Sequence, residues 1–339
     1  MSNKKIFNLI KDLSRNISIL DIGARGGLGW PWKDLNKDFV DLILVEPDIN
    51  EAQKIEKNLN KFQKAIVLPF AFWSNEGSLS LNLNQSPGTS SIFNSNHSFL
   101  NQFPDYKRFQ TIEKIKIKST TIDNLINSKK MPPFDFAKLD IQGGELAVLK
   151  GGESYLKSNV IGLEIEVEFA KMYKDQPLFA EVDMFVRNNI GLELWDLSKA
   201  HWKYSNTLND GPNKGRLIFG NALYFRPLES LERWLSDFSN QEAIEKLLML
   251  ITATISYGYL DYSNAILEHK VCSKYIDNNL KLEILKNLNS MSKSFKPFKN
   301  GNNILYKIFY ALSTIFQSSK NGRISNAKLG SQKKGPFWL

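Results

Sequence analysis

The sequence predicts an α/β fold, in which a doubly wound, mostly parallel sheet is followed by a C-terminal α-helical extension. Three observations support this prediction. In residues 1–228, short apolar segments alternate with polar, helix-forming segments, a pattern typical of a parallel sheet that helices cover on both faces. The first two apolar segments each end in an acidic residue, Asp21 and Glu46. After Pro227, residues 228–288 are helical in pattern and lack strand-like segments.

The elements of the first part follow in chain order from apolar runs, caps and periodicity. Strands are expected at residues 17–21, 41–46, 65–70, 134–140, 160–169, 192–196 and 217–225. Helices are expected at residues 49–60, 145–150 and 180–189. Pro47 and Asp48 are start signals for the first helix, and Gly151 and Gly152 end the second.

Two long segments interrupt the alternation. Residues 74–118 form a long segment that contains Gly, Ser, Asn and two prolines, and we expect short β pairing within them, at residues 79–83 and 115–118. Residues 197–216 form the second long loop. Long loops inside a compact domain are often lids or binding loops, so both segments are candidates to border a site.

The scarcity of cysteine and histidine limits the metal and redox sites that the chain can build. Cys272 is the only cysteine, so neither an intramolecular disulfide nor a cysteine-based zinc site is possible. The three histidines are too few for a histidine-rich metal site, and no metal ligands are predicted. His97 and His201 lie in the two long loops, where a histidine can act as a base near neutral pH but is more often a surface residue.

The net charge of +9 is concentrated near the C-terminus. The last acidic residue is Glu283, and the 56 residues after it contain ten lysines and arginines. Residues 1–283 carry a net charge of −1, so the body of the protein is not predicted to bind nucleic acid. A basic segment of this kind suits an anionic surface, and residues 284–339 are therefore a candidate for peripheral membrane contact.

Composition divides the chain into three parts. Residues 1–228 form the predicted α/β domain, residues 229–317 a helical extension, and residues 318–339 a basic tail that is predicted to be disordered. Residues 303–316 have the spacing of an amphipathic helix, which we expect to pack on protein rather than on lipid, because only Lys307 adds charge within it. With no run of roughly 18 apolar residues and no secretory signal, the expected location is the cytoplasm.

A glycine-rich turn follows the first predicted strand. The stretch ILDIGARGG ends that strand in Asp21 and runs into glycines, which let a backbone bend tightly and approach a ligand. The dinucleotide pattern G-x-G-x-x-G is absent, because the positions that it requires after Gly23 hold Arg25 and Leu28. The spacing of Asp21, Gly23 and Gly27 is D-x-G-x-x-x-G, which matches the S-adenosylmethionine loop of class I methyltransferases. The alternative is an ordinary α/β turn built from small residues.

Glu46 ends the second predicted strand, in the stretch LVEPD. A carboxylate at the end of that strand can accept hydrogen bonds from both hydroxyl groups of a ribose. The alternative is a solvated carboxylate at a strand end, and the nearby glycine turn favours the ribose interpretation.

A second motif, DFAKLDIQGGELAVLKGG, places charge on a covered strand. Lys138 and Asp140 share a strand face with Phe136, because side chains alternate along a strand. Charges on a covered strand are costly unless they are paired or used, so we expect Lys138 to form a structural ion pair. Asp140 lies at the carboxyl end of the strand, where we expect it to face the ligand cleft.

Three glutamates on the next predicted strand, Glu164, Glu166 and Glu168, share one face. Their mutual repulsion is expected to raise the pKa of at least one, which suits a general base for an acceptor hydroxyl group. A solvated strand end that pairs with a nearby lysine is the alternative. A divalent cation between Asp140 and Glu166 is a weaker alternative.

Together these motifs resemble the FkbM family of S-adenosylmethionine-dependent methyltransferases. The family pattern reads roughly D-[VI]-G-A-N-x-G, V-E-P, T-[LI]-D and K-[LI]-D-[VI]-E-G-x-E-x-x-V-L-x-G, where this chain has DIGARGG, VEPD, TTID and KLDIQGGELAVLKGG. The resemblance covers about residues 17–226. It implies a Rossmann-like class I methyltransferase fold, S-adenosylmethionine as the cofactor, and O-methyl transfer, commonly onto sugars or natural products. Arg25 stands where the family usually has Asn, and Gln142 where it usually has Glu.

The candidate site residues follow from the motifs and the resemblance. The residues assigned to the cofactor are Asp21, Gly23, Ala24, Arg25, Gly27, Glu46, Ala71 and Phe72, of which the last two flank the adenine. Asp140 is assigned to a place between cofactor and acceptor, and Glu145 and Glu166 are the candidate bases. The expected acceptor is a small molecule or a glycan, and the oligomeric state stays open.

The departures at Arg25 and Gln142 motivate a second hypothesis. It is a non-catalytic module with a methyltransferase fold that docks on a membrane or a protein partner through the basic tail. A nucleotide-dependent oxidoreductase is disfavoured, because the dinucleotide spacing is absent.

Overall fold

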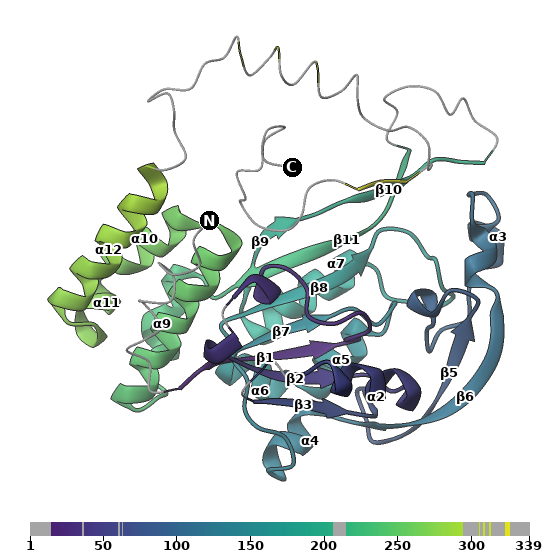
Figure 1. Cartoon of the computed structure of the whole chain (residues 1–339), viewed down its shortest axis with the longest axis horizontal. Coiled ribbons are helices and arrows are strands. Elements are labelled where there is room, and N and C mark those ends of the chain that lie inside the picture. Colours follow the sequence, from purple (N-terminus) through teal and green to yellow (C-terminus); the bar gives the residue numbers. More distant parts are fainter. Residues whose placement is uncertain are drawn as a thin grey trace.

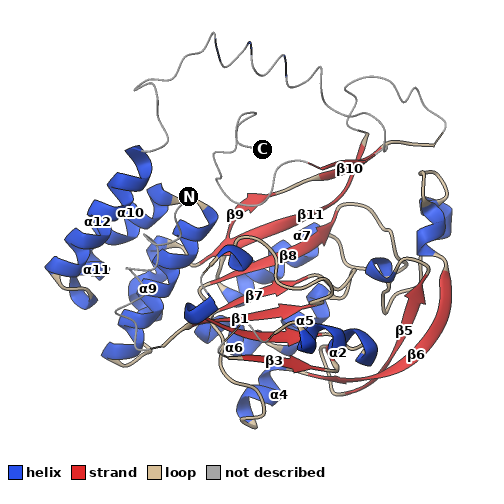
Figure 2. Cartoon of the chain, viewed as in Figure 1, coloured by secondary structure: helices blue, strands red, loops and turns tan. Residues whose placement is uncertain are grey.

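A nine-stranded sheet forms the centre of the structure (Figures 1 and 2). The computed structural model describes residues 15–35, 37–59, 62, 64–205, 215–293, 305, 308, 312 and 323–325. The strands of this sheet are β1 (Ile17–Ile22), β2 (Val40–Val45), β3 (Ala65–Leu68), β7 (Phe136–Leu139), β8 (Gly162–Glu168), β9 (Glu193–Leu197), β10 (Ala200–Trp202), β11 (Arg216–Phe225) and β12 (Arg323–Ser325). Their order is β12-β10-β11-β8-β7-β1-β2-β3, with β9 paired to β11.

The pairing confirms the predicted doubly wound, mostly parallel sheet. Strands β1, β2, β3, β7 and β8 run parallel, and β11 joins β8 in the antiparallel sense. The chain order reverses at β1, which pairs with β2 on one side and with β7 on the other. In open α/β sheets this switch point, at the carboxyl ends of the strands, is where ligands bind.

The central strands β1 and β8 are buried along their whole length, as their apolar sequences predict. All six residues of β1 and all seven of β8 are buried, which requires cover on both faces of the sheet. The predicted strand bounds agree with the observed ones to within two residues at each end. Strand β3 stops at Leu68 rather than at residue 70, because Pro69 has no N–H to donate to a ladder.

Outside the first long segment, the described residues of the α/β part of the chain form five α-helices. They are α2 (Ile49–Lys57), α4 (Ile122–Asn127), α5 (Glu145–Gly151), α6 (Glu153–Asn159) and α7 (Phe179–Phe185), which continues into a π-helical turn at Val186–Ile190. Helix α2 starts where predicted, because the Asp48 carboxylate accepts hydrogen bonds from the backbone N–H groups of Asn50 and Glu51. Helices α4 to α7 share one buried core with alternate residues of β1, β2, β7 and β8, and so cover one face of the sheet.

The first long segment forms a second, three-stranded sheet. Its strands are β4 (Ala71–Phe72), β5 (Gly77–Asn84) and β6 (Thr111–Thr120), in the order β4-β6-β5. The predicted pairing of residues 79–83 with 115–118 is confirmed and extends further. Between β5 and β6 lie helix α3 (His97–Leu100) and 3₁₀ turns at Pro87–Thr89 and Tyr106–Phe109. Two buried side-chain amides of β5 stabilise the segment that connects β5 to β6. Asn82 Nδ2 donates a hydrogen bond to Ser91 O at 3.0 Å, and Asn84 Nδ2 donates one to Thr89 O at 2.6 Å.

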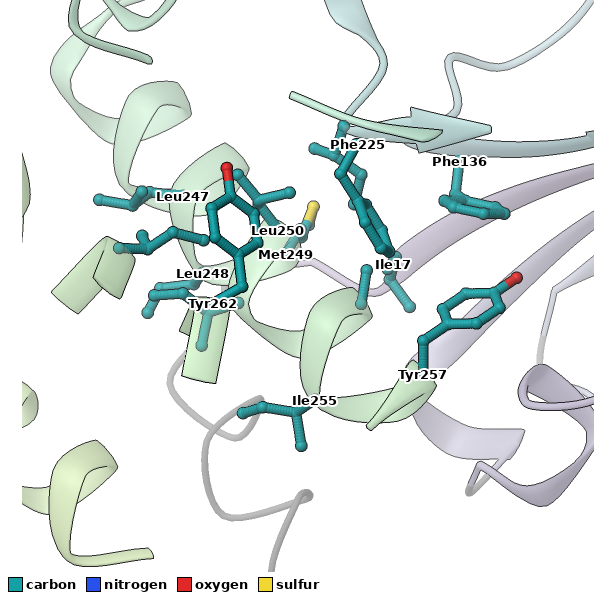
Figure 3. Close-up of a cluster of buried hydrophobic side chains, with 14 of the residues drawn as sticks. Ile17, Phe136, Phe225, Leu247, Leu248, Met249, Leu250, Ile255, Tyr257 and Tyr262 are labelled. Atoms are coloured by element: carbon teal, nitrogen blue, oxygen red, sulfur yellow. The ribbon is translucent and has the colours of Figure 1, made fainter. Parts of the chain in front are cut away.

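The helical extension covers the other face of the sheet. It consists of α8 (Leu231–Leu235), α9 (Asn240–Tyr257), α10 (Leu260–Glu268), α11 (Lys270–Tyr275) and α12 (Asn278–Lys293). Helix α9 is buried almost all round and shares one core with β1, β2, β7 and β11. Figure 3 shows this junction, with Ile17, Phe136 and Phe225 of the strands beside Tyr257 of α9. The extension is therefore one of the helical layers that a parallel sheet requires.

A buried ion cluster fastens α9 to the sheet. Asp135, which is fully buried just before β7, accepts hydrogen bonds from Arg15 at 2.7 and 2.8 Å and from Lys246 of α9 at 2.8 Å. It also accepts one from the backbone N–H of Ser18 at 3.0 Å. Burial alone raises the pKa of Asp135, but the Arg15 hydrogen bonds and the Lys246 charge lower it below its ordinary value. The carboxylate is therefore held ionised between two cations.

Most of the basic C-terminal segment lies outside the described residues. Of the predicted helix at 303–316, the structure describes Leu305, Ile308 and Leu312, which are helical and exposed. Of the predicted tail at 318–339 it describes only β12. Within the described residues, no helix is both long enough and apolar enough to cross a membrane.

The ion cluster makes a prediction about stability. Asp135→Asn should lower the free energy of unfolding by about 3–5 kcal/mol, because it leaves Lys246 buried with no full counter-charge. Urea denaturation measures the change. Glu232→Gln, which breaks the exposed Glu232–Lys270 pair, is the control and should unfold like the wild type. Equal midpoints for both variants would contradict the assigned role of Asp135.

Candidate functional site

A cavity of about 210 Å³ lies at the carboxyl ends of β1, β2 and β7. Its floor is formed by residues that end or follow these strands and β3, namely Ile22, Gly23, Arg25, Val45, Glu46, Pro47, Phe70, Ala71, Phe72, Trp73, Asp140, Ile141 and Gln142. Its roof comes from the three-stranded sheet and the turn after β5, namely Leu81, Leu83, Pro87, Gly88, Ser90, Ile92 and Ile117. The first long segment therefore borders the site, as its length suggested. Of the second long segment, the described residues 197–205 and 215–216 are not part of this lining.

The cavity combines apolar walls with two carboxylates. Phe70 and Phe72 meet edge to face at 5.7 Å on one side, across from the aliphatic roof. Glu46 and the partly exposed Asp140 supply the acidic groups. Such a lining suits a ligand with a flat apolar part and hydroxyl groups, because a carboxylate accepts hydrogen bonds that an apolar wall cannot.

Gly23 is required where β1 and β7 come together. Its φ is +83°, and a Cβ at this position would lie 2.0 Å from the carbonyl oxygen of Asp140. A substitution would therefore push the two strand ends apart. Gly27 also has a φ of +83°, but a Cβ there would meet open space. Glycine is favoured at this position only because the turn needs a left-handed backbone conformation.

Asp21 lies behind the cavity wall. It is fully buried, and neither of its carboxylate oxygens has a hydrogen-bond partner. The Lys138 Nζ lies 3.5 Å from Asp21 Oδ1 and 3.4 Å from Asp140 Oδ2, which confirms the predicted ion pair of Lys138. Burial raises the pKa of Asp21, and the Lys138 charge opposes that rise.

Arg25 is surrounded by three carboxylates. It forms ion pairs with Glu46 at 3.7 Å, Asp48 at 3.1 Å and Glu51 at 3.6 Å. Burial raises the pKa of Glu46, while a backbone hydrogen bond from Asp48 and the charge of Arg25 lower it. The arginine thus offsets the negative charge at the end of β2 that faces the cavity.

Glu145 organises the turn that carries Asp140. Its carboxylate accepts hydrogen bonds from the backbone N–H groups of Ile141 at 2.8 Å and Gly143 at 2.9 Å. Gln142, which has a φ of +63°, donates from Nε2 to Glu166 and, at 3.3 Å, to Asp140 Oδ1. The amide that replaces the usual family glutamate therefore connects two carboxylates.

The three glutamates of β8 face one side, as predicted, but they have different surroundings. Glu166 and Glu168 lie with Glu145 in one buried group, in which one oxygen of each is within 4.8 Å of the others. The pKa of each of the three is raised, that of Glu145 to about 7, with burial as the main cause and neighbouring carboxylates adding to it. Repulsion, the cause expected from the sequence, is therefore secondary to burial.

Glu164 instead contacts the helical extension. Tyr257 of α9 donates a hydrogen bond from its hydroxyl to Glu164 Oε2 at 2.6 Å. Burial raises the pKa of Glu164 to about 7, and this hydrogen bond and the Lys138 charge partly oppose the rise. Nothing in the sequence around Tyr257 indicates this contact, because the two residues are 93 positions apart.

The predicted site residues fall into two sets. Those that line the cavity are Gly23, Arg25, Glu46, Ala71, Phe72 and Asp140. Those that are buried but do not line the cavity are Asp21, Ala24, Glu145 and Glu166, and Gly27 is exposed and also outside the lining. His97 is exposed on α3 and His201 is buried in β10, and neither lines the cavity. The residues that sequence reasoning missed are the aliphatic roof, Gln142 as a connector and Tyr257.

Comparison with known proteins identifies one family. Residues 21–190 match the Methyltransferase FkbM domain family. No curated protein matches the chain.

The chain also has similarity to solved structures, at low sequence identity. An FkbM methyltransferase from Methylobacillus flagellatus KT is 16% identical, with a TM-score of 0.36, over 62% of this chain and 43% of its own. Magnesium protoporphyrin IX methyltransferase from Synechocystis PCC 6803, with bound SAM, is 10% identical, with a TM-score of 0.32, over 66% and 77%. TrmK from M. capricolum, in complex with S-adenosyl-homocysteine, is 12% identical, with a TM-score of 0.32, over 86% and 96%.

The raised pKa of Glu164 predicts a pH-dependent loss of stability. An unfolded glutamate titrates near pH 4.3, whereas Glu164 in the fold has a pKa of about 7. The folded state thus binds this proton more tightly, so stability falls as pH rises between these values. Relative to Glu164→Gln, the wild type should lose about 3 kcal/mol between pH 4.5 and pH 8 in urea unfolding.

A surface variant controls for other titrating groups. Glu113→Gln removes an exposed carboxyl of β6 and should follow the wild type across this range. Parallel pH profiles for the wild type and Glu164→Gln would show that Glu164 is not the group responsible.

Proposed function

The chain belongs to the FkbM methyltransferase family, and on that premise we propose that it transfers a methyl group from S-adenosylmethionine to a hydroxyl group of a sugar, glycan or natural-product acceptor. The observation that carries this proposal is the cavity at the switch point of the sheet, with Glu46 and Asp140 in its lining. The chain spans only 43% of the length of the Methylobacillus protein. Methyl transfer by this chain is therefore a proposal.

The residues at the cavity fit the proposed cofactor. Glu46 would accept hydrogen bonds from the ribose hydroxyls, and Ala71 and Phe72 would flank the adenine against the aliphatic roof. Gly23, Ala24 and Gly27 shape the loop after β1, and Arg25 balances the charge of Glu46. Asp21, assigned to the cofactor from the sequence, does not line the cavity, and its buried carboxylate lies 3.5 Å from the Lys138 Nζ.

Catalysis in this proposal depends on placing an acceptor oxygen and removing its proton. The sulfonium of S-adenosylmethionine supplies an activated methyl group, so the protein must orient the acceptor and accept a proton. Asp140 is the partly exposed acid in the cavity, and Lys138 and Gln142 hold its carboxylate on two sides. We assign the base to Asp140, and Gln142 connects it to Glu166, the base candidate that takes its place if Asp140→Asn keeps its activity. Glu145 is a positioning residue, because it holds the turn that carries Asp140.

The rival hypothesis is a non-catalytic module that kept the fold. This hypothesis is motivated by the departures from the family pattern at Arg25 and Gln142. The contacts of both residues weaken that motivation, because they give each side chain a role at the site. Arg25 pairs with Glu46, and Gln142 donates to two carboxylates that a glutamate at position 142 would repel. Peripheral membrane contact through residues 284–339 stays a separate proposal, because those residues lie mostly outside the described part of the chain.

Cofactor binding can be tested by calorimetric titration with S-adenosylmethionine. Glu46→Gln should raise the Kd roughly 10- to 100-fold, because hydrogen bonds to a charged group contribute about 1.5–3 kcal/mol. Glu51→Gln is the matched control, since it removes a different carboxylate beside Arg25 that does not line the cavity. The proposal fails if the folded wild type does not bind, or if the two variants bind equally well.

Methyl transfer can be tested with labelled S-adenosylmethionine and fractionated lysate of the source organism as acceptor. Asp140→Asn should lower the rate by about 10²- to 10⁴-fold, the usual contribution of a positioned base. Its Kd for S-adenosylmethionine should change little. Cofactor binding by the wild type without transfer to any fraction would favour the non-catalytic module.

A further inference from the structure

Three buried glutamates lie close enough together to share one ligand. Glu166 and Glu168 project from one face of β8, and Glu145 is the first residue of α5. One carboxylate oxygen of each lies within 4.8 Å of the other two. Oxygens that coordinate one Mg²⁺ at about 2.1 Å lie roughly 3–4 Å apart, so a small rearrangement brings these carboxylates to coordination distance.

One oxygen of this group has unused binding capacity. Glu168 is 1% exposed, and its Oε1 is buried without a hydrogen bond. Buried carboxylate oxygens are normally hydrogen-bonded, because burial removes the water that would otherwise solvate them. This observation is independent of the spacing of the three residues, and it points to a ligand that contacts Glu168.

The other two carboxylates are already oriented by neighbouring groups. Glu145 accepts hydrogen bonds from Ile141 N and Gly143 N, and Glu166 accepts one from Gln142 Nε2. A carboxylate has about four lone-pair positions, so each of them retains acceptors for a cation. Hydrogen bonds of this kind are what usually hold metal-ligating carboxylates in place.

Negative charge dominates the surroundings of the three glutamates. Burial is the main cause of the raised pKa of each of the three, and the nearby Asp140 carboxylate adds to it. The nearby cation Lys138 forms its ion pairs with Asp21 and Asp140. The group therefore needs neutralisation, which either a divalent cation or shared protons would provide.

From this geometry we propose that Glu145, Glu166 and Glu168 bind a divalent cation that prefers oxygen ligands, Mg²⁺ or Mn²⁺. Three carboxylates suit these hard cations better than Zn²⁺, which favours histidine and cysteine. Gln142 lines the cavity and donates to Glu166, so the cation lies beside the cavity. One consequence rests on the proposed function: a cation there would lower the pKa of an acceptor hydroxyl group.

The test is direct binding of Mn²⁺ to the full-length protein without S-adenosylmethionine. Electron paramagnetic resonance of free Mn²⁺ should show one equivalent taken up by the wild type, with Mg²⁺ as competitor. Glu168→Gln should weaken binding at least about tenfold, because it removes one ligand charge. Glu164→Gln is the matched control: it removes a buried carboxyl from the same face of β8 that contacts Tyr257 instead, and it should bind like the wild type.

Each outcome decides the proposal. No uptake by the folded wild type at millimolar Mn²⁺ or Mg²⁺ would overturn it and assign shared protons to the group, as would equal weakening by the two variants. If Glu168→Gln fails to fold, the melting temperature of the wild type decides, since a bound ion must raise it. Calorimetric titration with S-adenosylmethionine in the presence of EDTA tests cofactor binding without a divalent cation. A failure of the cation proposal can therefore be distinguished from a failure of the proposed function.

Discussion

The ion pairs of Lys138 with Asp21 and Asp140 are the interaction on which the site depends. They join the ends of two adjacent parallel strands, and those strands have their carboxyl ends at the same edge. Without a cation between them, two carboxylates this close on covered strands would repel and lose hydration. The same edge needs Gly23, whose missing Cβ lets β1 approach the backbone of Asp140. Charge and backbone contact therefore place the acid of β7 against the glycine loop of β1.

The helical extension is part of the fold around this edge and not an appendage. Helix α9 completes the layer on one sheet face, and Lys246 ties it to Asp135 at the start of β7. At its other end, Tyr257 reaches Glu164 in the same charged region of the sheet. One helix thus contacts both the residue before β7 and a residue within β8. Its burial links the stability of the fold to the electrostatics behind the cavity.

The inserted three-stranded sheet has the complementary task of closing the cavity. Its aliphatic residues form the roof of the cavity. Buried asparagine amides of β5 stabilise the segment that connects β5 to β6. The apolar roof and the acidic floor of the cavity together suit a ligand that has a flat apolar portion and hydroxyl groups. The carboxylates beside this floor, from Glu145 to Glu168, concentrate negative charge where burial makes it costly.

The sequence by itself determined the strands, the glycine loop and the acids at the strand ends, because each depends on local pattern: apolar runs, turn chemistry and alternation of side chains. It also determined that Lys138 would be paired, since a charge on a covered strand has no other stable arrangement. Only the tertiary structure decided that Asp21 lies behind the cavity while Asp140 faces it. It alone decided that Glu145 binds backbone N–H groups and that Glu164 separates from Glu166 and Glu168 to meet Tyr257. These outcomes depend on contacts between residues far apart in the chain, and no local pattern specifies which distant side chain will fill the space beside a given carboxylate.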